Sequence, residues 1–591
     1  PSLKDSSRAE NPVDAFVLSR LEAKGWSPAP QAPPRVLIRR VYNDLIGLPP
    51  SYEEIEAFAA ESRARPDAYE RLVDRLLASP HFGERWGRYW LDLARYAETC
   101  GYERDQPKPH AWKYRDWVVR AFNQDMPYDT FMRLQVAGDE VPGADESTVV
   151  ATGFLRLGTW NDEPNDPEEY KYDRLEDLIH ATSTSFLAMT VKCARCHDHK
   201  FDPVRQTDYY RMAAVFWAGP IEPGPRELLG GPDRKALGYD VLGWTDRGRE
   251  PRPLHLLLKG DPKRPGPVVE AGSLSMVPSL DRTFARATPG SKTSQRRLQL
   301  ADWLADPKHP LPARVWVNRI WQHHMGQALV RTPDNLGFNG DLPTHPELLD
   351  WLAAELVSNG WRSKPLHRLI LTSRTYRQAS IHPAASDYDR EDAGNKLWWR
   401  AERKRRDAES LRDALLSASG RLDATRVGGP GFMPALSPDA LEGLSMKDRA
   451  WTPSPPDDQR RRSLYVVAKR GLLLPLMTTF DFMDTTLPCA KRDVTLVPPQ
   501  ALALLNNVFA HDQSEALARR VMMGAPTTEG RVALAWRLAL GRDPSPAEAA
   551  LAAEHLSRQE AHFAGSRDAG PLALASLCHV LINSNEFLFV D

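Results

Sequence analysis

The sequence predicts a mainly α-helical protein of two helical lobes, joined by an irregular Pro- and Gly-rich junction with a few short β-strands. Apolar residues recur at helical spacing over most of the 591 residues, the pattern stops over residues 219–293, and it then returns. We therefore expect a first domain at residues 1–218, a junction at 219–293 and a second domain at 294–591.

The first predicted helix, residues 11–26, carries Val13, Val17 and Leu21 on one face, with Asn11 as N-cap and Pro12 as the first helical residue. The pattern predicts further helices of the first domain at residues 34–45, 51–60, 68–78, 84–97, 111–122, 172–189 and 207–217. It predicts helices of the second domain at residues 294–305, 313–325, 346–358, 366–377, 407–422, 512–523, 528–540, 546–564 and 571–583.

The junction contains short apolar runs at residues 253–258 and 266–269, which predict β-strands. Trp244, Leu256 and Val268 have the character of packed residues, so we expect a folded junction and not a flexible linker. Residues 461–467 alternate enough to predict one more strand.

The charge balance excludes some classes of protein. The sequence has 77 Lys and Arg against 78 Asp and Glu, a net charge of −1, which does not favour binding to nucleic acid or to an anionic membrane. No run of 18 apolar residues predicts a transmembrane helix. Residues 1–11 are polar and contain no secretory signal, and we expect that such a signal has been removed from an exported protein.

One motif predicts a cofactor. Residues 193–197 read Cys-Ala-Arg-Cys-His, the attachment pattern of c-type haem. The thiols of Cys193 and Cys196 would form thioether bonds to the two haem vinyl groups, and His197 would be the proximal iron ligand. The alternatives are half of a zinc site or a redox dithiol, but no second C-x-x-C is present and the surroundings are helical. Covalent haem attachment implies a periplasmic or otherwise extracytoplasmic location.

The residues after the motif are polar. Lys200, with Asp198, His199 and Asp202, is placed to contact the haem propionates or the axial imidazole, and the alternative is a solvated loop. The sequence does not determine the distal iron ligand. The distal side is either open or occupied by one of four candidates in the second domain: His323, His324, Met325 and His345.

The catalytic candidates are His199, Tyr102 and His345. Tyr102 lies in residues 96–112, where aromatic side chains, carboxylates and a histidine are the groups that a carbohydrate or other polar substrate requires, although an ordinary loop would have the same composition. We also expect the second domain to cover or approach the haem.

Three further features leave alternatives open. The acidic residues of 163–177 could bind calcium or favour a helix N-terminus. Arginines in 403–406 and 460–462 could contact haem propionates or the acidic face of a partner. Cys489 and Cys578 are a candidate disulfide pair, or else buried free thiols.

Long segments resemble a planctomycete-type cytochrome-like domain of unknown function followed by its usual C-terminal partner domain. The first domain carries the resemblance at residues 37–50, 82–96, 151–160 and 193–210. The second carries it at residues 314–330, 344–353, 366–378, 498–507 and 581–590.

The resemblance implies an exported protein with one haem c, and it suggests an exported alkaline-phosphatase-like protein or a redox protein as partner. It leaves the reaction open. Three hypotheses remain: a haem-dependent oxidoreductase acting on an extracytoplasmic substrate such as a carbohydrate, an electron-transfer cytochrome, and a structural or assembly protein stapled by haem. The first requires an open distal iron position.

Overall fold

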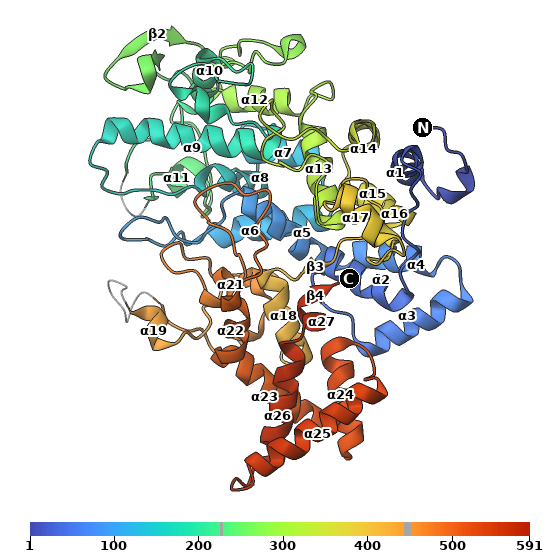
Figure 1. The fold of residues 1–591 in the computed structure, drawn as a ribbon. Coiled ribbons are helices and arrows are strands. Elements are labelled where there is room, and N and C mark those ends of the chain that lie inside the picture. The colour runs from blue at the N-terminus through green and yellow to red at the C-terminus, as the bar shows by residue number, and fades with distance from the viewer. Residues whose placement is uncertain (225–227, 443–450) are drawn as a thin grey trace.

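A computed structural model of the protein describes residues 1–224, 228–442 and 451–591, and it confirms the mainly α fold (Figure 1). The helices of the first predicted domain are α1 (Pro12–Ala23), α2 (Pro34–Ile46), α3 (Tyr52–Ala64), α4 (Ala68–Leu77), α5 (Pro80–Leu93), α6 (Ala111–Asn123), α7 (Tyr128–Ala137), α8 (Glu146–Ala151), α9 (Pro167–Leu187) and α10 (Gln206–Phe216). Short 3₁₀ helices there are η1 (Ser6–Arg8), η2 (Thr152–Arg156) and η3 (Val191–Arg195).

The junction holds α11 (Arg234–Leu237), β1 (Leu254–Leu257), η5 (Leu258–Gly260), β2 (Pro265–Val269) and η6 (Pro278–Leu280). The second predicted domain begins with α12 (Arg296–Leu304), α13 (Pro312–Met325), α14 (Pro346–Ser358), α15 (Ser363–Leu371), α16 (Arg374–Arg377), α17 (Ala385–Asp392), β3 (Lys404–Arg405), α18 (Ala408–Ala418) and α19 (Pro438–Leu441). It continues with η7 (Asp458–Arg460), η8 (Ser463–Tyr465), α21 (Pro475–Thr479), α22 (Pro498–Asn506), α23 (Val508–Gly524), α24 (Thr528–Leu540), α25 (Pro546–His562), α26 (Ala569–Ile582), α27 (Asn585–Leu588) and β4 (Phe589–Val590).

Local sequence signals set several helix starts. The Asn11 side chain accepts a hydrogen bond from the amide of Val13, and the Asp14 carboxylate accepts one from the amide of Asn11, which fixes the start of α1. The predicted helix at 366–377 is divided in two because Ser373 caps α16. Helices α7 and α8 were not predicted.

The junction is folded, with β1 and β2 paired in an antiparallel sheet. Trp244 and Leu256 are buried as expected. The expectation for Val268 is wrong: its side chain is 51% exposed, because β2 is an edge strand with largely exposed residues.

The strand predicted at residues 461–467 is also wrong. Residues 463–465 form the 3₁₀ turn η8, and Val466 makes only a single bridge to Phe432. The amide of Ser463 donates to the carboxylate of Asp413 at 2.8 Å and not to a neighbouring strand. A side chain therefore takes the place of a strand partner here.

Helices of the two predicted domains pack directly on each other. α7 contacts α12, α9 contacts α13, and α4 contacts α15, and one hydrophobic core cluster extends through both domains and the junction. The C-terminal helices α23–α26 pack together and form the projection at the bottom of Figure 1. Among the described residues, no helix combines the length and the apolar character that a membrane crossing requires.

A buried arginine joins all three segments. Arg297 of α12 is 0% exposed and lies 2.6 Å from Asp139, 3.2 Å from Glu140 and 3.1 Å from Asp246. Asp139 and Glu140 follow α7, and Asp246 belongs to the junction. Burial raises the pKa of Glu140 to about 7.

The five cysteines are all free thiols in the described structure. Cys489 and Cys578 therefore do not pair; both are free thiols, with Cys578 buried as the alternative expected and Cys489 only half-buried. Burial raises the pKa of both to about 12.

Candidate functional site

The Cys-Ala-Arg-Cys-His motif lies on the molecular surface, just after the long helix α9. The helix ends at Ala188 in a left-handed conformation, and the short 3₁₀ helix η3 follows. In a 3₁₀ helix, side chains three residues apart lie on the same side. Cys193 and Cys196 have this spacing and both are exposed, as is His197. The turn therefore presents two thiols and an imidazole together to solvent.

The hydrogen bonding of His197 fits the role of an iron ligand. Its Nδ1 lies 2.7 Å from the backbone oxygen of Asp198. Because a carbonyl only accepts, Nδ1 is the donor of this hydrogen bond, which leaves Nε2 as the ring nitrogen for a metal. Metal-bound histidines commonly donate their other nitrogen to a carbonyl in this way. The residues present therefore fit a haem c held by Cys193, Cys196 and His197.

The junction lies close against this motif. A Cβ atom placed on Gly260 of η5 would lie 2.5 Å from Sγ of Cys196, so only glycine, with its φ of +76°, leaves this thiol its space. Gln206 of α10 also bridges the carbonyls of Arg195 and Leu257. The junction thus positions the second thiol of the motif.

Arginines occupy most of the acidic cluster at 163–177. Arg195, inside the motif, lies 3.0 Å from both Asp173 and Glu176, and Asp177 pairs with Arg95 and Arg174. Within the ranges that the structure describes, no three His, Cys, Asp or Glu side chains form a group that could hold a metal ion. Calcium binding stays a prediction, and these contacts indicate a structural role for the cluster.

His199 holds the loop after the motif in shape. Its Nδ1 accepts a hydrogen bond from the amide of Asp202 at 2.8 Å, and its Nε2 lies 3.0 Å from the Thr190 hydroxyl. Its side chain is 6% exposed. Both ring nitrogens are therefore engaged within the loop, and the predicted catalytic role of His199 is not supported by a free nitrogen.

The second domain reaches this loop through residues 336–338. The amide of Leu336 donates to the carbonyl of Ala188 at 2.9 Å, and the amide of Phe338 donates to Asp202 at 2.7 Å. The second domain thus approaches the motif by backbone contacts, and not by the histidines proposed from the sequence.

Two other predicted site residues, Tyr102 and Lys200, are exposed. Tyr102 is 57% exposed, with a positive φ of 60°, in the loop between α5 and α6. Lys200 is exposed, and its Nζ lies 5.1 Å from the centre of the Phe201 ring. No contact in the described structure joins Tyr102 to the motif.

The candidate distal ligands have other neighbours. His324 is buried and shares a hydrogen bond of 2.7 Å with His367 of α15, and Met325 is buried in the core. His345 is 1% exposed beside Thr344, and burial lowers its pKa to about 3. His324, Met325 and His345 are therefore packed residues in the core of the second domain.

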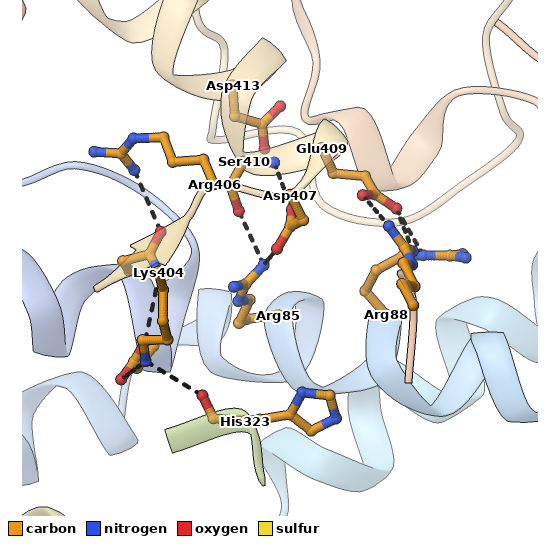
Figure 2. A network of polar contacts seen from close by, with 12 residues as sticks. Arg85, Arg88, His323, Lys404, Arg406, Asp407, Glu409, Ser410 and Asp413 are labelled. Carbon is orange, nitrogen blue, oxygen red and sulfur yellow. Dashed lines mark hydrogen bonds and ion pairs between the residues drawn. The ribbon is translucent and has the colours of Figure 1, made fainter. Parts of the chain in front are cut away.

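The fourth candidate, His323, lines a separate cavity of about 250 Å³ that the sequence did not predict. The walls come from α2, α5, the end of α13, residues 402–409 and residues 489–494. Figure 2 shows part of the polar network around it, with Arg85 and Arg88 on α5 reaching towards Asp407 and Glu409. No residue of 193–202 lines this cavity.

One wall of the cavity is a cluster of two arginines and two carboxylates. Arg492 lies 2.6 Å from Asp92 and 2.7 Å from Glu409, and Arg88 contacts the same two carboxylates. Burial opposes ionisation of Glu409, but the two arginines hold its pKa below the ordinary value. The cluster is therefore charged and internally balanced.

Two further ion pairs cross the cavity region. Arg85 pairs with Asp407, the N-cap of α18, and Lys404 lies 2.5 Å from Asp44 of α2. Lys404 also donates to the carbonyls of His323 and His324 at the end of α13. These contacts tie α2, α5 and α13 to the segment 404–407.

His323 stacks on Tyr89, with ring centres 3.5 Å apart. Burial and the nearby cations Arg85 and Lys404 lower its pKa well below the ordinary value, so the ring is neutral. Both side chains line the cavity. A neutral imidazole and a phenol thus remain available to a ligand.

The arginines of 403–406 belong to this region. Arg405 pairs with Asp481 at 2.6 Å, and buried Arg406 donates to the carbonyl of Phe587 and to Asn43. Arg461 donates to the carbonyls of Gly428 and Pro430. The interpretation of Arg405, Arg406 and Arg461 as free contacts for propionates or a partner is wrong, because each is engaged inside the protein.

The fold and these sites describe a two-domain, mainly α protein with a surface C-x-x-C-H motif. Residues 12–219 match a family model described as PSCyt2, protein of unknown function (DUF1549), and residues 296–556 match one described as PSD1, protein of unknown function (DUF1553). The chain therefore contains one domain of each of these two families, in the order that the resemblance implied. Comparison with curated proteins and with solved structures found no match.

Replacing Asp407 with asparagine is expected to lower the free energy of unfolding by about 3 kcal/mol at pH 7, the cost of leaving a buried cation unpaired. Burial opposes ionisation of Asp407, but Arg85 and Arg492 hold its pKa well below the ordinary value of about 3.9. The ionised Asp407 therefore stabilises the fold at pH values above about 3.9, and this stabilisation is lost progressively as the pH falls below about 3.9. Asparagine also caps helices, so the loss reports the ion pair.

Urea unfolding at pH 7 and pH 3 would measure this effect. The difference between wild type and Asp407→Asn should shrink at pH 3. The control is Asp457→Asn, whose side chain is 84% exposed beside Arg460, where about 0–1 kcal/mol is expected. A difference that is equal at both pH values would contradict the argument.

Proposed function

We propose that this protein is an exported mono-haem c-type protein that exchanges electrons with a partner at its surface. The observation that carries the proposal is the exposure of Cys193, Cys196 and His197 on one turn, with Nδ1 of His197 bound to a backbone carbonyl. When bound there, haem c supplies a one-electron redox couple. The surface position favours an exposed haem edge, which a partner protein can approach.

The chain's own residues have defined parts in this proposal. Cys193 and Cys196 would hold the cofactor, His197 would be its proximal ligand, and exposed Lys200 is placed to contact its propionates. The carbonyl of Asp198 would keep the His197 ring oriented. Partner docking at this face fits a redox protein or an exported alkaline-phosphatase-like protein, and covalent haem fits an extracytoplasmic location.

Electron transfer is favoured over a haem-dependent oxidoreductase by the separation of two features. The charged cavity of about 250 Å³ is lined by α5, α13 and residues 402–409, and by no residue of the motif. A haem oxidoreductase needs its substrate next to an open iron position. The motif instead lies on an exposed turn.

Spectra and gels of the purified full-length protein test the proposal. Haem-linked peroxidase staining should remain at the full chain mass on a denaturing gel, after acid–acetone extraction. The reduced protein should show no spectral change on addition of carbon monoxide, because electron-transfer haems have two strong axial ligands. Stain lost on extraction would overturn the covalent haem. Ready binding of carbon monoxide would overturn electron transfer in favour of an oxidoreductase.

A further inference from the structure

We propose that the cavity between the two family domains binds a small hydroxylated organic acid, such as a sugar acid. This site is separate from the haem motif and does not depend on the proposed electron transfer. Its walls combine α2 and α5 of the first family domain with α13 and residues 402–409 and 489–494 of the second. A ligand that fills the cavity would contact both domains.

The size of the cavity limits the ligand to a small molecule. Its volume of about 250 Å³ corresponds to roughly eight water molecules at ~30 Å³ each. That space fits a single sugar-sized ring and excludes a polymer chain of several sugars.

The carboxylates that line the cavity are each paired with a cation of the protein, Glu402 with Arg400 at 3.5 Å. Asp92 and Glu409 are each bound by two arginines. Asp407 is bound by Arg85 and by the amide of Ser410, and Asp44 is bound by Lys404 and by the Tyr376 hydroxyl. The acidic groups are therefore used inside the protein and do not select a cation.

The polar groups left without partners are mainly donors. The Nε of Arg85 is buried without a hydrogen-bond partner, and the Tyr89 hydroxyl and the N–H of the neutral His323 ring, which both line the cavity, can each donate one hydrogen bond. Exposed Lys491 and Arg403 add positive charge to the lining. In total seven Lys or Arg and five Asp or Glu line the cavity, an excess of two positive charges. Unpaired donors and net positive charge favour an anion.

One buried acceptor points to hydroxyl groups on the same ligand. Oε1 of Gln322 is buried without a hydrogen-bond partner, while Nε2 of the same amide donates to the carbonyl of Ala490 at 2.8 Å. Sulfate has no proton to offer this oxygen. A ligand with both a carboxylate and hydroxyl groups satisfies the donors and Gln322 together.

Titration calorimetry of the full-length protein with D-glucuronate as the probe tests this inference. Glucuronate should bind with a Kd in the micromolar to low millimolar range. Two control ligands should each bind at least about tenfold more weakly, the effect of losing one hydrogen bond to a charged group. They are glucose, which lacks the carboxylate, and inorganic sulfate, which lacks the hydroxyl groups. Two results would overturn the proposal that the ligand is a hydroxylated acid. One is no binding of glucuronate at about 10 mM, and the other is binding of sulfate as tight as that of glucuronate.

A matched pair of variants locates the binding. Tyr89→Phe removes one hydroxyl from the cavity and keeps the ring that stacks on His323, so it should weaken glucuronate binding about tenfold. Tyr128→Phe removes an unpartnered hydroxyl, from α7, which does not line the cavity, and should leave Kd unchanged. Equal affinities of Tyr89→Phe and wild type would overturn the location. Haem content is not involved in this measurement, so it fails or succeeds independently of the proposed electron transfer.

Discussion

The double variant Cys193→Ala, Cys196→Ala is expected to carry no covalent haem, and each single variant is expected to keep at most one thioether bond. Both thiols are exposed on one turn, so removing them takes away the attachment points without opening the core. The measurement is haem-linked peroxidase staining of denaturing gels, together with the mass of the intact chain.

The matched control is Cys578→Ala, which removes a thiol that is buried in α26. Its staining should equal that of wild type, because Cys578 belongs to the C-terminal helices and not to the motif. His197→Ala should keep the thioether bonds but change the absorption spectrum, since the proximal ligand is lost. Staining of the double variant at wild-type intensity would refute attachment at these residues.

The motif could be predicted from the sequence because its chemistry is local. Cys193, Cys196 and His197 are within five consecutive positions, and one short turn presents all three. Helix starts such as the Asn11 cap were predictable for the same reason, since a cap depends on residues two or three positions apart.

The cavity could not be predicted because its residues come from five separate segments of the chain. Arg85, Arg88 and Asp92 lie three or four positions apart on one face of α5, a spacing that signals a charged stripe on an otherwise buried helix. The partners of that stripe, Asp407, Glu409 and Arg492, are more than 300 positions away. Residue type alone also misplaced the histidines, because His324 pairs with His367 in the core.

Strand patterns failed where side chains replace backbone partners. Over residues 461–467, the neighbours Arg462 and Ser463 both bind Asp413, and backbone pairing is limited to single bridges of Arg461 with Asp423 and of Val466 with Phe432. Conversely, β3 and β4 are two residues each and pair across nearly 200 positions of the sequence, so no local pattern predicts them. Tertiary contacts, and not propensity, decide these segments.

Replacing Arg297 with methionine is expected to lower the free energy of unfolding by about 3–5 kcal/mol at pH 8. The arginine is fully buried, and its removal leaves Asp139, Glu140 and Asp246 facing one another without a cation. Asp139 and Glu140 belong to the first domain, Asp246 to the junction and Arg297 to the second domain. The variant should therefore loosen the packing of all three segments. Equilibrium unfolding in urea, with limited proteolysis within the junction, would measure both effects.

The pH dependence of the Arg297→Met variant separates charge from packing. Burial already raises the pKa of Glu140 to about 7, above its ordinary value of about 4.3, and loss of the arginine raises it further. A carboxyl group whose pKa is raised in the folded state favours folding when protonated, so the variant should regain stability as the pH falls from 8 to 5. Adding Glu140→Gln should restore part of the loss at pH 8. Arg296→Met is the control, because Arg296 is only half-buried and donates to a single carbonyl, that of Ala214. A loss below ~1 kcal/mol for Arg297→Met, the range of a surface ion pair, would show that this buried arginine does not hold the three segments together.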